Sequence, residues 1–122
     1  MANELLLSIA ASFSKGGRTA DTRNMGASGV FIDVSGTDFF HGTQTIGTSP
    51  EAIDLGDITT PGYIVIKNRD ATNFVEIRDG SGGADVVKLL AGDVQCFRLA
   101  TSTPFAVADT ASCEIEYLLV EA

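Results

Sequence analysis

The sequence predicts an all-β protein, an antiparallel β-sandwich of jelly-roll type with about eight or nine short strands. From Ile53 to Val120 the chain is a series of short apolar runs, rich in β-branched and aromatic residues. Turn residues such as Pro61-Gly62 and Ala91-Gly92-Asp93 separate these runs at intervals of about ten residues. Each run ends before an amphipathic helix could complete its apolar stripe.

The first segment, Leu5 to Phe13, places larger apolar residues at every second position, as a half-buried strand does. A helix capped by Asn3 is the alternative, but the strand template fits the spacing better. Gly16-Gly17 suits a two-residue hairpin turn, because glycine adopts positive φ without steric cost. We therefore expect a strand, a tight turn and a polar return strand over Arg18 to Asn24.

Between Met25 and Pro50 the pattern is weaker. Val30, Ile32 and Val34 occupy every second position, with Phe31 and Asp33 between them on the other face, which indicates another strand. From Thr37 to Pro50 the composition turns to Gly, Thr, Ser and Gln, and only Thr43 to Ile46 suggests a short edge strand.

The regular part begins at Glu51 to Leu55 and contains two apparent hairpins. In each, a short polar connection joins two apolar runs, which is most simply an antiparallel pair. The first joins Tyr63–Lys67 to Phe74–Arg78 and the second joins Val86–Leu90 to Val94–Leu99, with a further short strand at Phe105–Val107.

The closing strand, Cys113 to Val120, has a clear inner face. Its inward residues are Cys113, Ile115, Tyr117 and Leu119, while Glu114 and Glu116 face water. Leu118 and Val120 are apolar on the outer face as well. Burial on both sides predicts that this strand is central in its sheet or lies in a subunit contact.

The length of 122 residues predicts one sandwich domain over residues 1–122, in which the loop-rich segment 18–50 is used for contacts. A chain of this size buries roughly two thirds of its unfolded surface. Its composition, 44% hydrophobic and 20% charged, is that of a packed domain and not of a disordered segment.

The charge balance argues against direct binding of nucleic acid. Sixteen acidic and eight basic residues give a formal charge of −8, which repels a phosphate backbone. Between Arg23 and Lys67 there is no basic residue but there are five acidic ones. These acidic residues are interpreted as a solvated acidic face. The alternative is a surface that matches a basic patch on a partner.

The two cysteines, Cys96 and Cys113, lie inside apolar runs and are expected to be free thiols, with a bridge between neighbouring strands as the alternative. Leu5 to Phe13 is too short to span a membrane and has no basic residue before it. We expect neither a signal peptide nor a membrane anchor, and synthesis in a cytoplasm.

Candidate catalytic and metal residues are few. His41 is the only histidine, so a catalytic triad or a histidine-based metal site would depend on it alone. The Asp79–Asp85 loop weakly matches a calcium loop but lacks the alternating acids of an EF-hand, and we interpret it as a hairpin loop. The prediction is a protein that is not an enzyme and has no cofactor and no metal. A small jelly-roll enzyme is the disfavoured alternative.

Phe39 and Phe40 stand next to each other in a polar segment. Consecutive residues of an extended chain point to opposite sides, so both rings seldom reach one core. One of them is therefore a candidate anchor for a partner. The interpretation slightly favoured over such a contact is that the segment covers an open end of the sandwich and buries both rings.

A group of motifs resembles a known family, the small structural proteins of tailed bacteriophages. The resemblance covers residues 51–120, and residues 1–50 match only through Gly42–Thr48. The motifs are Glu51–Ile58, Pro61–Val75, Lys88–Asp93, Phe97–Leu99 and Glu116-Tyr117.

The resemblance implies a capsid decoration (cement) protein that acts by binding alone on the outer surface of the virion. Its partner would be the major capsid protein, and it would form a homo-oligomer, with a trimer expected first and a dimer second. A tail, baseplate or host-adhesion component of the virion is the alternative. Under this reading the residues expected to bind the partner are Arg18, Arg23, Met25, Phe39, Phe40 and His41.

Overall fold

The computed structural model describes residues 4–23 and 25–121. The chain divides into two units, Met1–Ser35 and Gly36–Ala122. In the part of the chain that is described, every regular element is a β-strand, and all strand pairs are antiparallel. The predicted all-β class is therefore confirmed.

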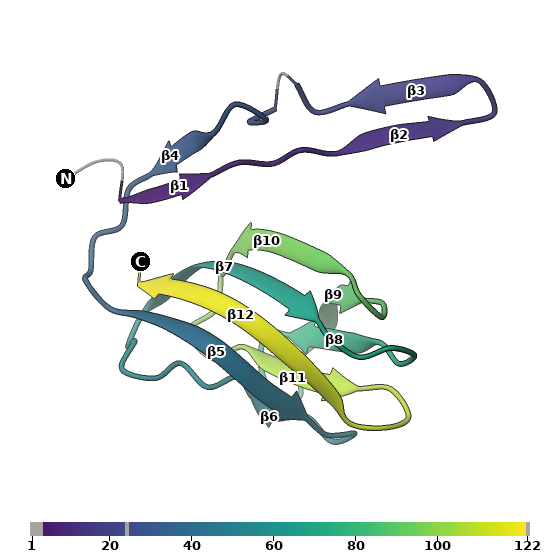
Figure 1. Cartoon of the computed structure of the whole chain (residues 1–122). Coiled ribbons are helices and arrows are strands. Elements are labelled where there is room, and N and C mark those ends of the chain that lie inside the picture. The colour runs from purple at the N-terminus through teal and green to yellow at the C-terminus, as the bar shows by residue number, and fades with distance from the viewer. Residues whose placement is uncertain (1–3, 24, 122) are drawn as a thin grey trace. The chain divides into compact units, whose positions relative to one another are not determined.

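The first unit is a long β-hairpin, here called the arm (residues 4–35). β1 (Leu5–Leu7) pairs with β4 (Val30–Ile32), and β2 (Ser12–Lys15) pairs with β3 (Arg18–Asp21) (Figure 1). Gly16 and Gly17 join β2 to β3 with φ angles of 60° and 76°, the positive values that this turn requires. The glycine turn is confirmed, and so is a return strand over Arg18–Asp21, whereas Asn24 lies outside the described residues. The strand predicted over Leu5 to Phe13 is divided into β1 and β2.

A threonine holds the arm together where its two ladders are interrupted. The Thr22 hydroxyl accepts a hydrogen bond from the Ala11 backbone N–H at 2.8 Å and donates one to the Ile9 carbonyl at 3.2 Å. The Thr22 N–H also donates to the Ala11 carbonyl at 3.0 Å. A side chain thus replaces part of the backbone pairing between β1–β4 and β2–β3.

The second unit is a β-sandwich of two four-stranded sheets that face each other (Figure 1). The β12 sheet has the order β10-β7-β12-β5, and the β11 sheet has the order β6-β11-β8-β9. The strands are β5 (Phe39–Ile46), β6 (Glu51–Ala52), β7 (Pro61–Asn68), β8 (Val75–Arg78), β9 (Asp85–Leu89), β10 (Val94–Arg98), β11 (Phe105–Ala108) and β12 (Cys113–Glu121).

The strand order is that of a jelly roll, because the chain passes repeatedly from one sheet to the other and only β8 and β9 are successive in the same sheet. The sandwich itself has eight strands. The described chain has twelve, more than the eight or nine expected, because the arm adds four short ones. The sequence prediction placed one sandwich over residues 1–122, whereas all sandwich strands lie between Phe39 and Glu121.

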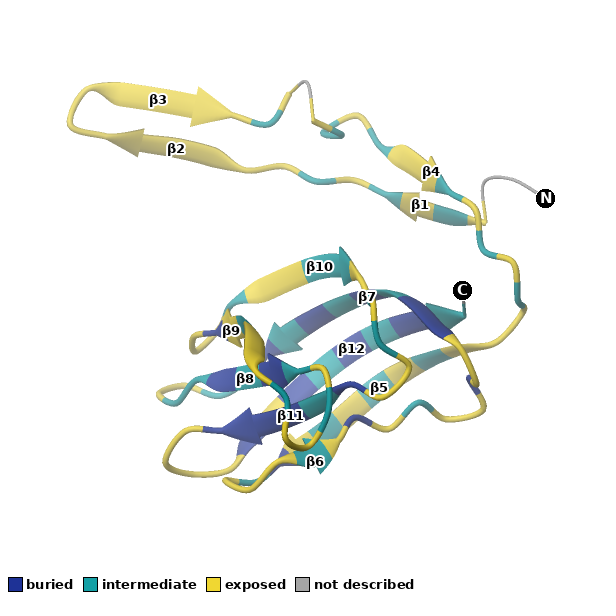
Figure 2. Ribbon diagram, turned by 180° about the vertical axis from the view of Figure 1, so that it is seen from behind, coloured by how far each residue is buried: buried dark blue, intermediate teal, exposed yellow. Residues whose placement is uncertain are grey.

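The core lies between the two sheets and is built from alternate residues of each strand (Figure 2). On β12, Cys113, Ile115, Tyr117 and Leu119 are at most 1% exposed, as the alternation predicted. β12 lies between β7 and β5, so the prediction of a central strand is confirmed. The other fully or nearly buried apolar residues include Ile46, Ile64, Ile66, Val75, Ile77, Leu89 and Ala106.

Both hairpins predicted for the regular part are wrong. β7 belongs to the β12 sheet and β8 to the β11 sheet, so the connection after Asn68 crosses from one sheet to the other. The same holds for β9 and β10. Short connections in a jelly roll can bridge sheets, and local spacing does not distinguish that crossing from a hairpin. The hairpin expected across the Asp79–Asp85 loop does form, between β8 and β9.

Asn68 fastens the two crossings to each other. Its side chain is fully buried, and its Nδ2 donates to the carbonyls of Asn73, Leu89 and Leu90 at 2.9, 3.1 and 3.3 Å. Its Oδ1 accepts from the Asp70 N–H at 2.9 Å. One buried amide therefore satisfies backbone groups of the β7–β8 and β9–β10 connections.

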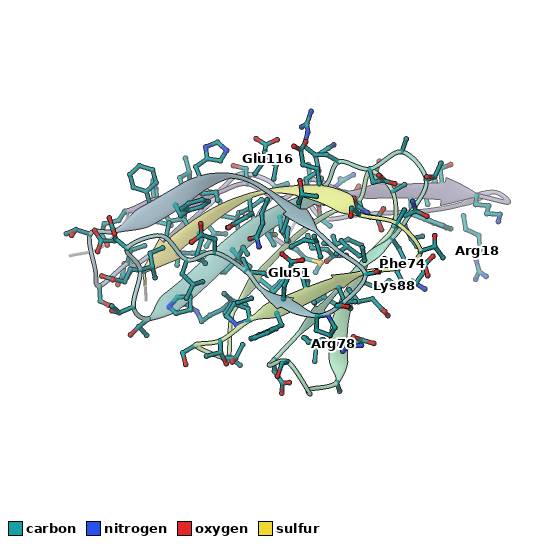
Figure 3. The ribbon with its side chains drawn as sticks, turned by 90° about the horizontal axis from the view of Figure 1, so that it is seen from below. Arg18, Glu51, Phe74, Arg78, Lys88 and Glu116 are labelled. Carbon is teal, nitrogen blue, oxygen red and sulfur yellow. The ribbon has the colours of Figure 1, made fainter. Side chains whose placement is uncertain are left out.

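A cation–π contact lies near the same crossings. The Lys88 ammonium of β9 lies 4.0 Å from the centroid of the Phe74 ring, which immediately precedes β8 (Figure 3). This contact joins the start of β8 to its neighbour β9, next to the backbone pair Glu76–Lys88.

The segment 18–50 contains more regular structure than its composition suggested. It holds β3, β4 and the eight-residue β5, which begins at Phe39 and not at Thr43. β5 is an edge strand of its sheet, as expected. Its exposed residues Phe39, His41, Thr43 and Thr45 alternate with half-buried or buried ones, which explains the polar composition.

Candidate partner-binding surface

The outer face of the β12 sheet carries two rows of side chains that cross all four strands. Cross-strand pairing places Val94, Lys67, Glu116 and Thr43 in one row. It places Cys96, Val65, Leu118 and His41 in the next. The middle of this face is therefore apolar, although it points away from the core.

A shallow depression of about 230 Å³ lies on this outer face. Val65, Leu118 and Val94 supply its apolar lining, and Lys67, Glu116 and His41 its polar lining. Val65 and Leu118 are half-buried, whereas Val94 is 55% exposed. Protein interfaces commonly combine an apolar centre with a polar rim, so this depression is a candidate for a partner contact.

Ion pairs hold the charged side chains at the rim of this depression in place. Glu116 accepts a hydrogen bond from Arg69 Nη1 at 2.8 Å, and its other carboxylate oxygen lies 3.3 Å from His41 Nε2 (Figure 3). Arg69 also lies 3.9 Å from Glu114. These side chains are 36–58% exposed, so water screens the pairs and they fix geometry more than they add stability.

The structure separates the three predicted residues of β5. The Phe39 side chain lies on the exposed side of the strand and is 68% exposed. Phe40 lies on the inner side, where its ring stacks on Tyr117 with centroids 5.2 Å apart. His41 returns to the outer face beside Glu116. The interpretation in which both phenylalanines are buried is therefore wrong, and Phe39 is the exposed one.

Tyr117 anchors Phe40 from inside the sandwich. Its hydroxyl donates to the Asp54 carbonyl at 2.5 Å and lies 3.3 Å from Gln44 Oε1. Burial, with a smaller contribution from the Asp54 carboxylate, raises the pKa of Tyr117 well above its ordinary value. The phenol stays neutral, and Phe40 has a structural role that Phe39 does not share.

The remaining predicted residues belong to the arm. Arg18 lies on β3 directly opposite Lys15, next to the glycine turn. Arg23 pairs with Asp21 at 2.8 Å, and this hydrogen bond lowers the pKa of the Asp21 carboxyl. Met25 is 71% exposed. Arg18, Arg23 and Met25 thus lie in one unit, and Phe39 to His41 in the other.

The arm also has an apolar face, which is not among the residues predicted to bind a partner. Cross-strand pairs Leu5–Ile32 and Leu7–Val30 place four aliphatic side chains on one side of the ladder. The strict alternation from Leu5 to Phe13 is a sequence signal of this face, although a strand that faces a core shows the same pattern. Likewise, the apolar outer residues of β12 are a sequence signal of the apolar surface around Leu118.

The structure shows what surrounds the Asp79–Asp85 loop and the two cysteines. Asp85 forms an ion pair with Arg78 at 2.5 Å (Figure 3). Among residues 4–23 and 25–121 no three His, Cys, Asp or Glu side chains gather as a metal site would require. Cys96 and Cys113 are both free, as expected. Burial, followed by the charges of Asp70 and Asp109, raises the pKa of the Cys113 thiol.

A larger cleft of about 690 Å³ lies at the edge of the sandwich. It is lined by residues of β8, β9 and β10 and of the segment after β10, among them Val87, Phe97 and Leu99. Those three side chains are half-buried and pack against the core, so the cleft continues the space between the two sheets.

No protein family model, no curated protein and no solved structure matches the chain. The described residues include no helix that is long and apolar enough to cross a membrane.

Proposed function

We propose that the chain is a structural protein of a tailed-phage virion that decorates the outer surface of the capsid and acts by binding alone. Its partner is the major capsid protein, and it works as a homo-oligomer, a trimer first and a dimer second. The proposal starts from the resemblance of residues 51–120 to phage structural proteins. It is strengthened by the shape and surface of the arm.

The arm is the observation that carries the proposal. It is a two-stranded ladder with exposed apolar side chains at Leu6, Phe13, Met25, Val30 and Phe31, each 47–71% exposed. A ladder of two strands has no second layer to cover such residues, and isolated ladders are marginal in water. Exposed apolar side chains grouped on one element are typical of a protein-interaction surface.

Phe39 supports the same function from the sandwich. The ring stands on edge strand β5 with 68% of its area exposed, next to the apolar outer face of the β12 sheet. Large aromatic residues at the border of an apolar patch are frequent binding hot spots. Contacts of this kind, repeated over an oligomer, give strong attachment to a symmetric shell.

The direct test is decoration of empty shells. Purified chain is mixed with shells assembled from the major capsid protein of the same phage, and the bound copies per shell are counted by quantitative mass spectrometry. Variants Phe39→Ser and Arg18→Glu are expected to lower occupancy at least tenfold while remaining folded. Val86→Ser is the matched control, because Val86 is 63% exposed but lies on β9 of the β11 sheet.

Saturable binding of hundreds of copies supports decoration. A handful of copies per purified virion, with no binding to shells, would overturn it in favour of the tail or baseplate alternative. Equal occupancy for Phe39→Ser, Arg18→Glu and wild type would remove these residues from the contact.

A further inference from the structure

The two sides of the sandwich, where its sheets end, are closed to different degrees. On the side of β5 and β6, the Gln44 side chain accepts a hydrogen bond from the Asp54 N–H and donates one to the Ala52 carbonyl, both at 2.9 Å. Glu51 accepts another from the Gly47 N–H at 2.8 Å. Edge strand β5 is therefore tied to the segment around β6.

The opposite side is formed by β9 and β10, which are also edge strands (Figure 2). Within the described residues no hydrogen bond joins these two strands. The cleft of about 690 Å³ lies on this side. Its volume falls in the range of small-molecule sites, roughly 300–1,000 Å³.

The cleft has an apolar lining. Ile77 is 2% exposed, and Val87, Phe97 and Leu99 are half-buried against the core. Ile77 and Val87 belong to the β11 sheet, and Phe97 belongs to the β12 sheet. The apolar body of a ligand placed here would contact both sheets and remove apolar area from water.

A β-bulge lies beside this lining. Ile77 pairs with Val87 and Arg78 pairs with Asp85, so Val86 is an extra residue in β9. Bulges of this kind redirect side chains and occur often next to binding sites. Both Arg78 and Val86 line the cleft.

Arg78 has hydrogen-bond donors left for a ligand. Its Nε donates to Asp85 Oδ1, and the side chain is only 25% exposed. Among the residues that the structure describes, none accepts a hydrogen bond from its terminal Nη1 or Nη2. A guanidinium is a planar fork of N–H donors that matches the geometry of a carboxylate.

The other ionisable side chains of the lining favour a ligand with a single negative charge. Arg98 also lines the cleft, and no described acid forms an ion pair with it. Asp79 is the one acid in the lining, but its carboxylate lies against Gly83, outside the lining. Because Asp85 offsets the charge of Arg78, the site suits a carboxylate better than a doubly charged phosphate.

We propose that the cleft between β9 and β10 binds a small amphipathic carboxylate, such as a medium-chain fatty acid. Its alkyl body lies on Val87, Phe97 and Leu99, and its carboxylate accepts hydrogen bonds from Arg78. This binding requires neither a capsid nor a second copy of the chain, so its test is independent of decoration.

Decanoate and decan-1-ol are the probes, because they share an alkyl chain and only the first carries a carboxylate. Each is titrated below its aggregation limit into the nitrogen-15-labelled full chain, and amide signals are followed by NMR. Decanoate is expected to shift the signals of Val87, Phe97 and Leu99 in a saturable way and to leave those of Val65 and Leu118 unchanged. Decan-1-ol should bind about tenfold more weakly, because it gains no charge-assisted hydrogen bond.

The role of charge is tested by the double variant Arg78→Gln/Asp85→Asn, which removes both charges of the pair together. Its affinity for decanoate should fall to that for decan-1-ol. Arg69→Gln/Glu116→Gln is the matched control, because this ion pair lies outside the cleft, and it should bind decanoate like the wild type.

The role of the space is tested by Ala100→Trp. Ala100 is exposed and lines the cleft, so an indole at this position fills it from outside the core and should abolish binding of both probes. Ala71→Trp, at an exposed alanine of the β7–β8 connection, is the control, and circular dichroism verifies folding. No saturable shifts with decanoate, equal affinity for the two probes, or wild-type binding by the cleft variants would overturn the proposal.

Discussion

Asn68 is the residue on which the connections of the sandwich depend most. It is a polar side chain with no exposed area, and each of its polar atoms is paired. Its backbone takes part as well, since the Asn68 N–H donates to the Asp93 carbonyl and its carbonyl accepts from Gly92. Buried amides of this kind fix a unique arrangement, because any other packing leaves a donor or acceptor unpaired.

Asn68→Asp should therefore be strongly destabilising. The substitution keeps the shape of the side chain but replaces a donor of three hydrogen bonds by a carboxylate oxygen that faces three carbonyls. We expect the free energy of unfolding to fall by about 3 kcal/mol or more at neutral pH. Urea unfolding followed by circular dichroism measures this change.

Gln95→Glu is the matched control. Gln95 is exposed on β10, and the substitution makes the same change from amide to carboxylate. Its effect should stay below about 1 kcal/mol, within the range of surface substitutions. A loss for Asn68→Asp no larger than that of the control would contradict the role assigned to the buried amide.

At the scale of elements, edge strand β5 is positioned by a close contact with the loop that follows β6. Gly56 has a φ of 59°, and its Cα faces the ring of Phe40. A Cβ at this position would lie 2.8 Å from Phe40 Cδ2. Phe40 in turn stacks on Tyr117, so the glycine allows the ring to close the end of the core.

Gly56→Ala is expected to lower the free energy of unfolding by about 1–3 kcal/mol, because alanine is strained at this φ and its methyl group displaces the Phe40 ring. Thermal unfolding measures the loss. Gly80→Ala is the control, since Gly80 has open space around its Cα and lies in the β8–β9 loop. If the two alanine variants melt together, the Phe40–Gly56 contact does not support β5.

The sequence predicts the strands of this molecule better than their partners. Local alternation locates β12 and its inward residues, and Gly16-Gly17 locates the turn of the arm, because both depend on nearest-neighbour chemistry. The assignment of β7 and β8 to one hairpin failed for the opposite reason. Whether a six-residue connection turns back or crosses depends on long-range contacts such as that of Asn68, which lie outside any local window.

For the candidate surface, too, the sequence predicts the local features but not the long-range contacts. Alternation correctly implies that Phe39 and Phe40 point to opposite sides, yet only the core contact with Tyr117 decides which ring is buried. The apolar outer face around Val65 and Leu118 is assembled from strands far apart in the sequence. Such a face becomes visible only when the sheet order is known.

For the whole molecule, the two units differ in their ability to fold alone. Every member of the buried apolar core lies between Ile46 and Leu119, and no described residue of the arm belongs to it. Residues 36–122 are therefore expected to fold as an independent domain with a single cooperative thermal transition. A peptide of residues 1–35 should show little stable structure in water, because a two-stranded ladder is marginal by itself.

Truncation tests this expectation. The fragment of residues 36–122 should keep the β-sheet circular dichroism of the sandwich and sharp, dispersed amide signals in a nitrogen–proton NMR spectrum. Its midpoint of unfolding should be close to that of the full chain measured at low concentration. A fragment without a cooperative transition would show that the sandwich requires the arm.

The position of β12 sets the order in which the sandwich can be completed. β5 and β7 are its two neighbours, and β5 pairs with it across a separation of more than sixty residues, as in the pair Cys113–Ile46. During synthesis the ribosome therefore releases β5 and β7 long before the strand that joins them exists. Two unpaired strand edges stay open for that interval, and such edges are sites of aggregation. Closure by β12 is a late, non-local event, so slow folding and a need for protection of the growing chain follow from the topology.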